Sequence, residues 1–309
     1  MADVLDTPPQ LGANRKGRIG RYLLLLWRDK FAFAAAVYLV VLVVCAIVAP
    51  LFLSQDALTM NLRARNAPPF RPDVGWTMIL GADALGRSIL ARILVGAGNT
   101  LGIAAAAVAL SMVVGAILGL VAGHFRGWVD TVIMRAADIT MSFPSLLLAL
   151  IVLYILSPAI SNMIIVLAIT RVPIYLRTIR AEVLEIRERM FVTAARTLGA
   201  SQWRLVCRHI APMAMPTLIT IATLDFAFVM LSEASLSFLG LGIQAPNITW
   251  GLMVAEGRAY LATAGWLSFW PGLAIALTAM ALNLLSNWLR TVTDPKQRWR
   301  LEGGKLADA

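Results

Sequence analysis

The sequence predicts an all-α, polytopic membrane protein with six transmembrane helices. Hydrophobic residues make up 59% of the 309 residues and charged residues only 14%, whereas soluble domains average about a quarter charged residues. A helix needs about 20 apolar residues to cross the hydrocarbon core. Four uncharged runs are long enough, at residues 31–53, 101–122, 139–170 and 267–289. A fifth run, 213–235, has the length but contains Asp225 and Glu233.

The N-terminal segment, residues 1–30, is polar and precedes the first span, 31–53. It carries six basic residues: Arg15, Lys16, Arg18, Arg21, Arg28 and Lys30. Because basic residues are enriched on the cytoplasmic side of membrane proteins, we expect this segment in the cytoplasm. It is too long and too polar for an ordinary cleavable signal, so the first span is predicted to be a retained anchor.

Residues 54–100 are predicted to lie outside the cytoplasm. The prolines within 66–72 exclude a helix there, because proline removes a backbone donor and restricts the residue before it. The motif that follows contains Asp83, Gly86 and Arg87 and predicts a turn leading into a membrane helix. We expect Arg87 to pair with Asp83 and close this loop, which is a structural role.

Glycines recur at every fourth position toward the end of the second predicted span, 101–122, and just after it: Gly115, Gly119 and Gly123. This spacing places them on one face, where small residues allow another helix to approach closely. The alternative is that glycine is simply common in membrane helices.

The run 139–170 is too long for one span, and Ser157 with Pro158 divides it into spans 135–156 and 160–179. Arg171 and Arg177 are taken to mark where the fourth span emerges. Near the start of the third, Arg135 and Asp138 are one helical turn apart and are expected to neutralise each other, as an interfacial packing pair.

The fifth span is predicted at 213–235. Asp225 and Glu233 are eight positions apart, so they share one face of this helix. Ionisable groups at membrane depth are functional hypotheses by default. Facing a pore, they could attract a peptide amino terminus or a cation; alternatively, they bond neighbouring helices and stiffen the bundle. The sequence leaves both open.

Residues 236–264 are predicted to form an external re-entrant or capping segment. Gly240, Gly242 and Pro246 exclude a regular helix there, and irregular backbone at membrane depth needs cover from protein or water. The sixth span, 267–289, returns to the cytoplasm, and the basic tail 291–309 follows. Six spans place both termini on the cytoplasmic side.

The strongest signal is the charged, helix-forming segment at residues 187–212, between the fourth and fifth spans. Its arginines hold it in water, and their side of the membrane is predicted to be cytoplasmic. Good helix formers precede Gly199, which permits a close turn, and Pro212 suits the start of the next helix. The residues expected to matter are Thr193, Ala194, Ala195, Arg196, Gly199, Ala200, Arg204 and Pro212. The alternative is an ordinary basic loop with two surface helices.

Several stretches in order resemble the dipeptide/oligopeptide/nickel family of ABC-importer permeases, in particular its "C"-type subunit. They are LGADALGRSILARILVGAGNTL (80–101), RAADITMSFPSLLLAL (135–150), RVPIYLRTIRAEVL (171–184), the segment 187–212, EASLSFLGLGIQAPNITWG (233–251) and NLLSNWLRTVTDPK (283–296). In 187–212 the chain resembles the family's "EAA…G…P" loop, which receives the stroke of the ATPase. Thr193 stands where the family often has Glu, and His209 where it often has Ile.

The resemblance implies a bacterial inner-membrane permease with the type I ABC-importer fold. Its implied partners are a homologous "B"-type permease, two cytoplasmic ATPases that bind ATP and Mg, and an external solute-binding protein. Dipeptides, oligopeptides, nickel chelates, modified peptides and glutathione-like molecules all fit as substrates.

The sequence lacks the motifs of several other functions. It has no phosphate-binding loop, so we expect no ATP site, and no bound cofactor, on this chain. Cys45 and Cys207 predict neither a disulfide nor a metal site, and His124 and His209 are too few and too far apart for one. No enzyme motif and no basic-aromatic platform for nucleic acid is present. The competing class is an ion-coupled secondary transporter, which predicts inverted repeats and midplane ion sites.

Overall fold

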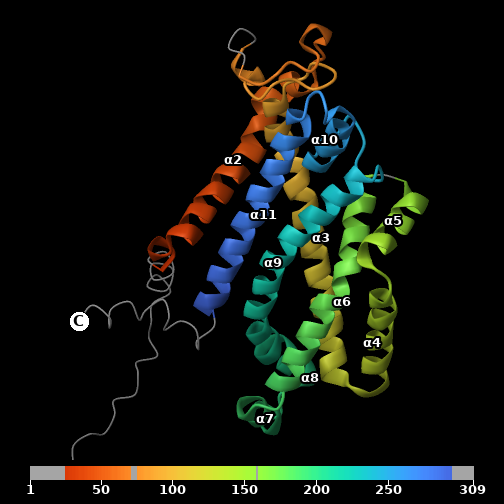
Figure 1. Ribbon diagram of the computed structural model, residues 1–309. Coiled ribbons are helices and arrows are strands. Elements are labelled where there is room, and N and C mark those ends of the chain that lie inside the picture. Colours follow the sequence, from red (N-terminus) through yellow and green to blue (C-terminus); the bar gives the residue numbers. More distant parts are fainter. Residues whose placement is uncertain (1–24, 71–74, 158, 294–309) are drawn as a thin grey trace, which may run out of the picture.

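The computed structural model describes residues 25–70, 75–157 and 159–293, and these form a bundle of long tilted helices (Figure 1). Most of the N-terminal segment 1–30 and of the tail 291–309, together with Pro158, lie outside the described residues. The long helices are α2 (Lys30–Leu58), α3 (Ile89–Phe125), α6 (Ile160–Ile186), α9 (Ala211–Phe238) and α11 (Trp266–Thr293). At one end of the bundle lies α10 (Trp250–Gly257), and at the other lies α7 (Met190–Thr197) (Figure 1).

Five helical stretches of the described chain are long and apolar enough to cross a membrane, and the third predicted span would be the sixth. The prediction of one continuous helix at 135–156 is wrong. α4 (Gly127–Ser142) and α5 (Ser145–Leu156) are bent by 89° at a short break. The break falls at Phe143, whose backbone is extended. The next residue is Pro144, and a proline disfavours the helical conformation of the residue before it.

The helices also extend past the predicted spans. α3 begins at Ile89 rather than near residue 101, and Ser88 caps it by accepting the Ala91 N–H at 3.1 Å. Its 37 residues measure about 55 Å at 1.5 Å per residue. Because the hydrocarbon core is about 30 Å thick, α3 continues beyond the membrane. α6 likewise continues to Ile186, past residue 179, where the fourth span was predicted to end.

At the α10 end, residues 239–249 are irregular and α10 then packs against α9, α11 and α3. Trp250 is fully buried there. Its backbone N–H donates to Thr100 Oγ1 at 3.0 Å, and its indole Nε1 donates to Ile93 O at 2.8 Å. These bonds fix α10 to the first third of α3.

α3 and α6 lie in contact at the three glycines of α3. A Cβ on Gly115 would lie 2.5 Å from Tyr175 Cβ, and one on Gly119 would lie 2.7 Å from Leu176 O. A Cβ on Gly123 would lie 2.8 Å from Val183 Cβ. Real Cβ atoms essentially never come this close, so any larger residue here separates the two helices.

We predict that Gly119→Leu lowers the thermal unfolding temperature and the yield of folded protein in detergent, because overpacking a tight contact costs about 1–3 kcal/mol. Gly102→Leu is the matched control, since a Cβ on Gly102 of the same helix meets nothing within 4 Å. Equal unfolding temperatures for the two variants would show that the glycine contact does not hold the bundle together.

Candidate functional site

The segment 187–212 folds into two short helical pieces at the α7 end. α7 (Met190–Thr197) is followed by a turn in which Gly199 has φ +85°, a left-handed conformation that glycine adopts at little cost. Ser201 then caps α8 (Gln202–Arg204). A π-helical stretch, Leu205–Ile210, leads into α9, where Pro212 lies in the first turn.

An apolar cluster anchors this segment to the bundle. Val192 of α7 and Leu205 and Ile210 of the π-helical stretch are fully buried. They belong to one core cluster with residues of α6 that include Ile179 and Val183. The cluster also contains Ala214 and Leu218 of α9, so α7 shares one core with α6 and α9.

The opposite face of the same segment is exposed. Three large apolar side chains are exposed here: Met190 is 89% exposed, Leu198 87% and Trp203 77%. Of the residues predicted for this loop, Ala195 and Ala200 are half-buried against the core cluster. The others are exposed: Thr193, Ala194, Arg196, Gly199, Arg204 and Pro212.

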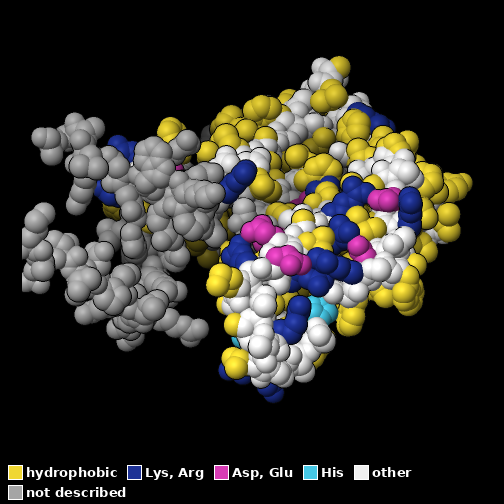
Figure 2. All heavy atoms as spheres, turned by 90° about the horizontal axis from the view of Figure 1, so that it is seen from below, with side chains coloured by type: hydrophobic (Ala, Val, Ile, Leu, Met, Phe, Trp, Pro, Cys, Tyr) yellow, Lys and Arg dark blue, Asp and Glu magenta, His cyan; other side chains and the backbone are white. Residues whose placement is uncertain are grey.

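Basic side chains gather on this end of the molecule (Figure 2). Arg187 donates from Nη1 to the carbonyl oxygens of Gly123 and His124, both at 3.2 Å, so it satisfies the C-terminal end of α3. Burial lowers the pKa of the Arg187 guanidinium, which nevertheless stays protonated at neutral pH. By contrast, Arg196 and Arg204 form no ion pair among the described residues and are free to bind a partner.

Inside the bundle, Asp225 lies in an ion pair between α9 and α6. Its carboxylate contacts the Arg171 guanidinium and accepts a hydrogen bond from Tyr175 Oη at 3.0 Å. Arg171 lies over the ring of Phe228, 4.1 Å from its centroid. Arg171 therefore does not mark the end of the fourth span: it lies in the middle of α6 and neutralises a buried carboxylate.

Glu233 is also fully buried. Its Oε1 accepts hydrogen bonds from Ser237 Oγ at 2.8 Å and Thr249 Oγ1 at 3.0 Å. Thr249 caps α10, so this carboxyl group connects α9 to the start of α10. The contacts of Asp225 and Glu233 therefore agree with the second of the two alternatives given above, in which these residues bond neighbouring helices.

The expected pair between Arg135 and Asp138 is not formed. Asp138 accepts from Arg177 Nη2 of α6 at 2.5 Å, and Arg135 is exposed. About two turns of α4 away, Asp130 accepts two hydrogen bonds from Arg180, at 2.5 and 2.6 Å. Sequence spacing alone could not show this, because the arginines come from a neighbouring helix.

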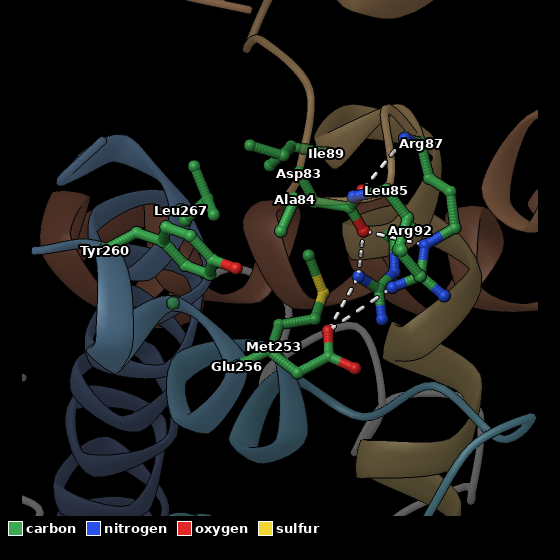
Figure 3. A pocket seen from close by; sticks show the side chains of 11 residues that line it. Asp83, Ala84, Leu85, Arg87, Ile89, Arg92, Met253, Glu256, Tyr260 and Leu267 are labelled. Atoms are coloured by element: carbon green, nitrogen blue, oxygen red, sulfur yellow. Dashed lines mark hydrogen bonds and ion pairs between the residues drawn. The ribbon is translucent and has the colours of Figure 1, made fainter. Parts of the chain in front are cut away.

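At the α10 end, Asp83 is the centre of a buried ion cluster (Figure 3). It pairs with Arg87 at 2.7 Å and with Arg92 at 2.5 Å, and Arg92 also pairs with Glu256 of α10 at 2.8 Å. The turn requires glycine at position 86, because a Cβ there would lie 1.8 Å from Asn61 O. The predicted Asp83–Arg87 pair is present, whereas no motif or spacing singled out Arg92 and Glu256.

This ion cluster borders a cavity of about 240 Å³, lined also by Tyr260 and Leu267 (Figure 3). The positive and negative side chains around it are paired with each other. Within the described parts of the chain, no three His, Cys, Asp or Glu side chains come close enough to hold a metal ion. The described residues thus form a packed helical bundle. Its segment 187–212 is exposed on one face and anchored in the core on the other.

Comparison with known proteins defines the class. Residues 115–299 match the family described as binding-protein-dependent transport system inner membrane component, and residues 23–69 match the N-terminal transmembrane domain of oligopeptide transport permease C. The chain belongs to this family of inner-membrane permeases. It is a permease subunit of an ABC importer with the type I fold, and a transport component rather than an enzyme.

Similar proteins cover nearly the whole chain. A putative peptide transport system permease protein of Brucella abortus is 37% identical over 98% of this chain and 96% of its own. A probable D,D-dipeptide transport system permease protein of Escherichia coli is 37% identical over 88% and 91%. A glutathione transport system permease protein of Pectobacterium atrosepticum is 35% identical over 87% and 88%.

We predict that Asp225→Leu destabilises the protein by about 3 kcal/mol, because it leaves the Arg171 charge buried without its partner. Adding Arg171→Met should recover most of this loss, since well-packed apolar groups often replace a buried ion pair without cost. Thermal unfolding in detergent measures both effects. If the double variant were no more stable than Asp225→Leu, the two side chains would not act as a pair.

Proposed function

We propose that the segment 187–212 is the site at which this permease receives the movement of its ATPases. The carrying observation is a helix with two different faces: Val192 is fully buried in the core, while Met190 and Leu198 are almost fully exposed. An exposed apolar patch with basic residues beside it is typical of a protein–protein interface. We accordingly propose that the α7 end lies on the cytoplasmic side of a bacterial inner membrane, and that both chain termini are cytoplasmic.

The proposed partners follow from the class. ABC importers of this kind work with a second permease, ATPase subunits and a solute-binding protein. For this chain we infer a homologous "B"-type permease, two ATPases that bind ATP and Mg, and a binding protein on the α10 side. No cofactor is assigned to the chain itself, and the bilayer covers its apolar surface.

Transmission of the stroke follows the contacts. Movement of α7 displaces the core cluster around Val192, which contains residues of α6 and α9. The Arg171–Asp225 pair makes α6 and α9 move together, and the glycine contact carries α3 with α6. The three helices thus form one rigid body that can tilt against the second permease. The bend between α4 and α5 is a hinge at which the chain can change its angle.

The proposed substrate is a dipeptide, an oligopeptide or a related small solute. The names of the similar proteins support this, because they include peptide, D,D-dipeptide and glutathione permeases. An ion-coupled secondary transporter has less support, because the buried carboxylate of Asp225 is neutralised by Arg171 instead of being open to an ion.

We predict that Gly199→Asp abolishes most ATP-driven uptake while the ATPases still co-purify. A side chain at φ +85° is strained by roughly 1 kcal/mol, so the turn between α7 and α8 must change shape. Uptake into proteoliposomes, with ATPase activity measured in parallel, checks this.

Gly75→Asp is the matched control. Gly75 also has positive φ, +101°, and open space around its Cβ, but it lies on the chain before α3 and far from α7 in the sequence. Normal uptake by Gly199→Asp, with the ATPases bound, would contradict the assignment of this turn.

We also predict that Leu198→Asp releases the ATPases during purification, because it places a carboxylate in an apolar contact. Leu62→Asp should leave them bound, since Leu62 is similarly exposed, at 70%, and lies before α3. Stoichiometry in a tagged pull-down from membranes measures the difference. Retention of the ATPases by both variants would place their docking surface elsewhere.

A further inference from the structure

A partly exposed arginine lies on the face that α6 and α9 share. The Arg171 side chain is 15% exposed, whereas that of its partner Asp225 is only 1% exposed. Arg171 lies over the ring of Phe228, 4.1 Å from the centroid, and Phe228 is itself 43% exposed. The surface of the bundle therefore presents the positive member of this ion pair, and the negative member is buried behind it.

The depth of Arg171 in the membrane follows from its neighbour Val172. A Cβ on Gly115 of α3 would lie 2.9 Å from Val172 O, so Arg171 lies at about the level of Gly115. α3 contains no Asp, Glu, Lys or Arg over residues 93–125, whose midpoint is residue 109. From residue 109 to Gly115 is about 9 Å at 1.5 Å per residue. Half of the hydrocarbon core is about 15 Å thick, so Arg171 lies at hydrocarbon depth.

The face that carries Arg171 differs from the exposed face of α2. The exposed side chains along the middle of α2 are apolar, among them Val40, Val44 and Ile47, as a surface against lipid requires. Ionisable side chains at membrane depth almost always face protein or a water-filled cavity. The exposed edge of Arg171 therefore faces the second permease or the path between the two permeases, and not lipid.

Polar groups continue from Arg171 toward the α7 end. Thr178 and Glu182 follow Arg171 at spacings of 7 and 11 residues, which return to the same side of a helix. Both are half-buried, and Glu182 accepts a hydrogen bond from Thr217 Oγ1 of α9 at 2.8 Å. A row of donors and acceptors of this kind is typical of the lining of a transport path.

We propose that this face of α6 and α9 borders the solute path, and that Arg171, stacked on Phe228, binds the carboxylate of the solute as it passes. The inference deepens the proposed function and rests on its peptide-like solute, because a peptide with a free C-terminus carries this group. It names Arg171 as a specificity-determining residue of the permease itself.

The Arg171 guanidinium has capacity for a second partner. Among the described residues it contacts Asp225 through Nη2, and its Nε has no hydrogen-bond partner. Arginine has five N–H donors in a planar arrangement that matches carboxylates. Asp225 holds the guanidinium in position from behind, and the exposed ring of Phe228 offers apolar surface to a solute side chain. A peptide amino terminus, which a free Asp225 would attract, is repelled by the exposed cation instead.

The test uses the full chain assembled with its partners in lipid nanodiscs, with Cys45→Ala and Cys207→Ala and one new thiol, Leu224→Cys. Leu224 is 40% exposed and lies one turn of α9 from Phe228. Labelling rates are measured with two methanethiosulfonate reagents, one carrying a carboxyethyl group and one a trimethylammonioethyl group, with and without ATP. We expect the ratio of the carboxylate rate to the ammonium rate to be several-fold higher than for mercaptoethanol in the same buffer, because the field of Arg171 attracts one probe and repels the other.

Variants identify the source of the charge. Arg171→Met with Asp225→Leu should return the ratio to that of mercaptoethanol, and apolar replacement of a whole buried pair often leaves stability unchanged. Arg258→Met is the matched control, because Arg258 also lies over a phenylalanine of α9, 5.1 Å from the ring centroid of Phe238. Phe238 is about 15 Å along α9 from Phe228, so this control should keep the raised ratio.

Any of three results would overturn the proposal. Absence of Leu224→Cys labelling by both reagents, with and without ATP, means that the second permease or lipid covers this face. A ratio equal to that of mercaptoethanol means that the face is wet but attracts no carboxylate. A raised ratio that survives removal of Arg171 and Asp225 assigns the charge to another group.

The first two of these results are read with the native ion pair, so they do not depend on a variant that folds. Val44→Cys provides the lipid-facing reference: it lies on α2, 53% exposed, and should react with neither charged reagent. Labelling is read without transport, so failure of this proposal leaves the ATPase contact at α7 intact.

Discussion

Backbone atoms of α3 and α6 approach each other at Gly115, Gly119 and Gly123, where even a methyl group would collide with Leu176 O or Val183. In lipid, helices gain little from the hydrophobic effect on association, so close packing of this kind supplies much of the attraction. Once α3 and α6 are in contact, other contacts become possible. Arg187 reaches the end of α3, and α4, which follows α3, comes within reach of Arg177 and Arg180.

Buried charge then selects the position of α9. A carboxylate at membrane depth is expensive unless it is paired, and Asp225 is paired only where α9 lies beside Arg171 and Tyr175 of α6. The same rule applies at the other end, where Asp83 joins the start of α3 to α10 through Arg92 and Glu256. Polar groups thus fix the register of helices whose apolar surfaces would fit in several ways.

Much of the fold could be predicted from the sequence, because uncharged runs and membrane thickness together determine span number and length. The turn at Asp83–Arg87 could also be predicted, since both members of the pair belong to one motif. Partners contributed by other helices could not: Arg177 for Asp138, Arg171 for Asp225 and Glu256 for Arg92 depend on tertiary contacts. The bend at Phe143 could have been predicted from Pro144. It was missed because the apolar run around it is long enough for a continuous span.

In the proposed function, α7 is the point where force enters the permease. The most direct test is site-specific cross-linking from Leu198→Cys, in a background without Cys45 and Cys207, to the ATPases in native membranes. The account predicts a cross-link whose yield changes when ATP is added, and no cross-link from Leu62→Cys. A Leu198→Cys protein that transports normally but forms no ATPase cross-link with or without ATP would contradict it.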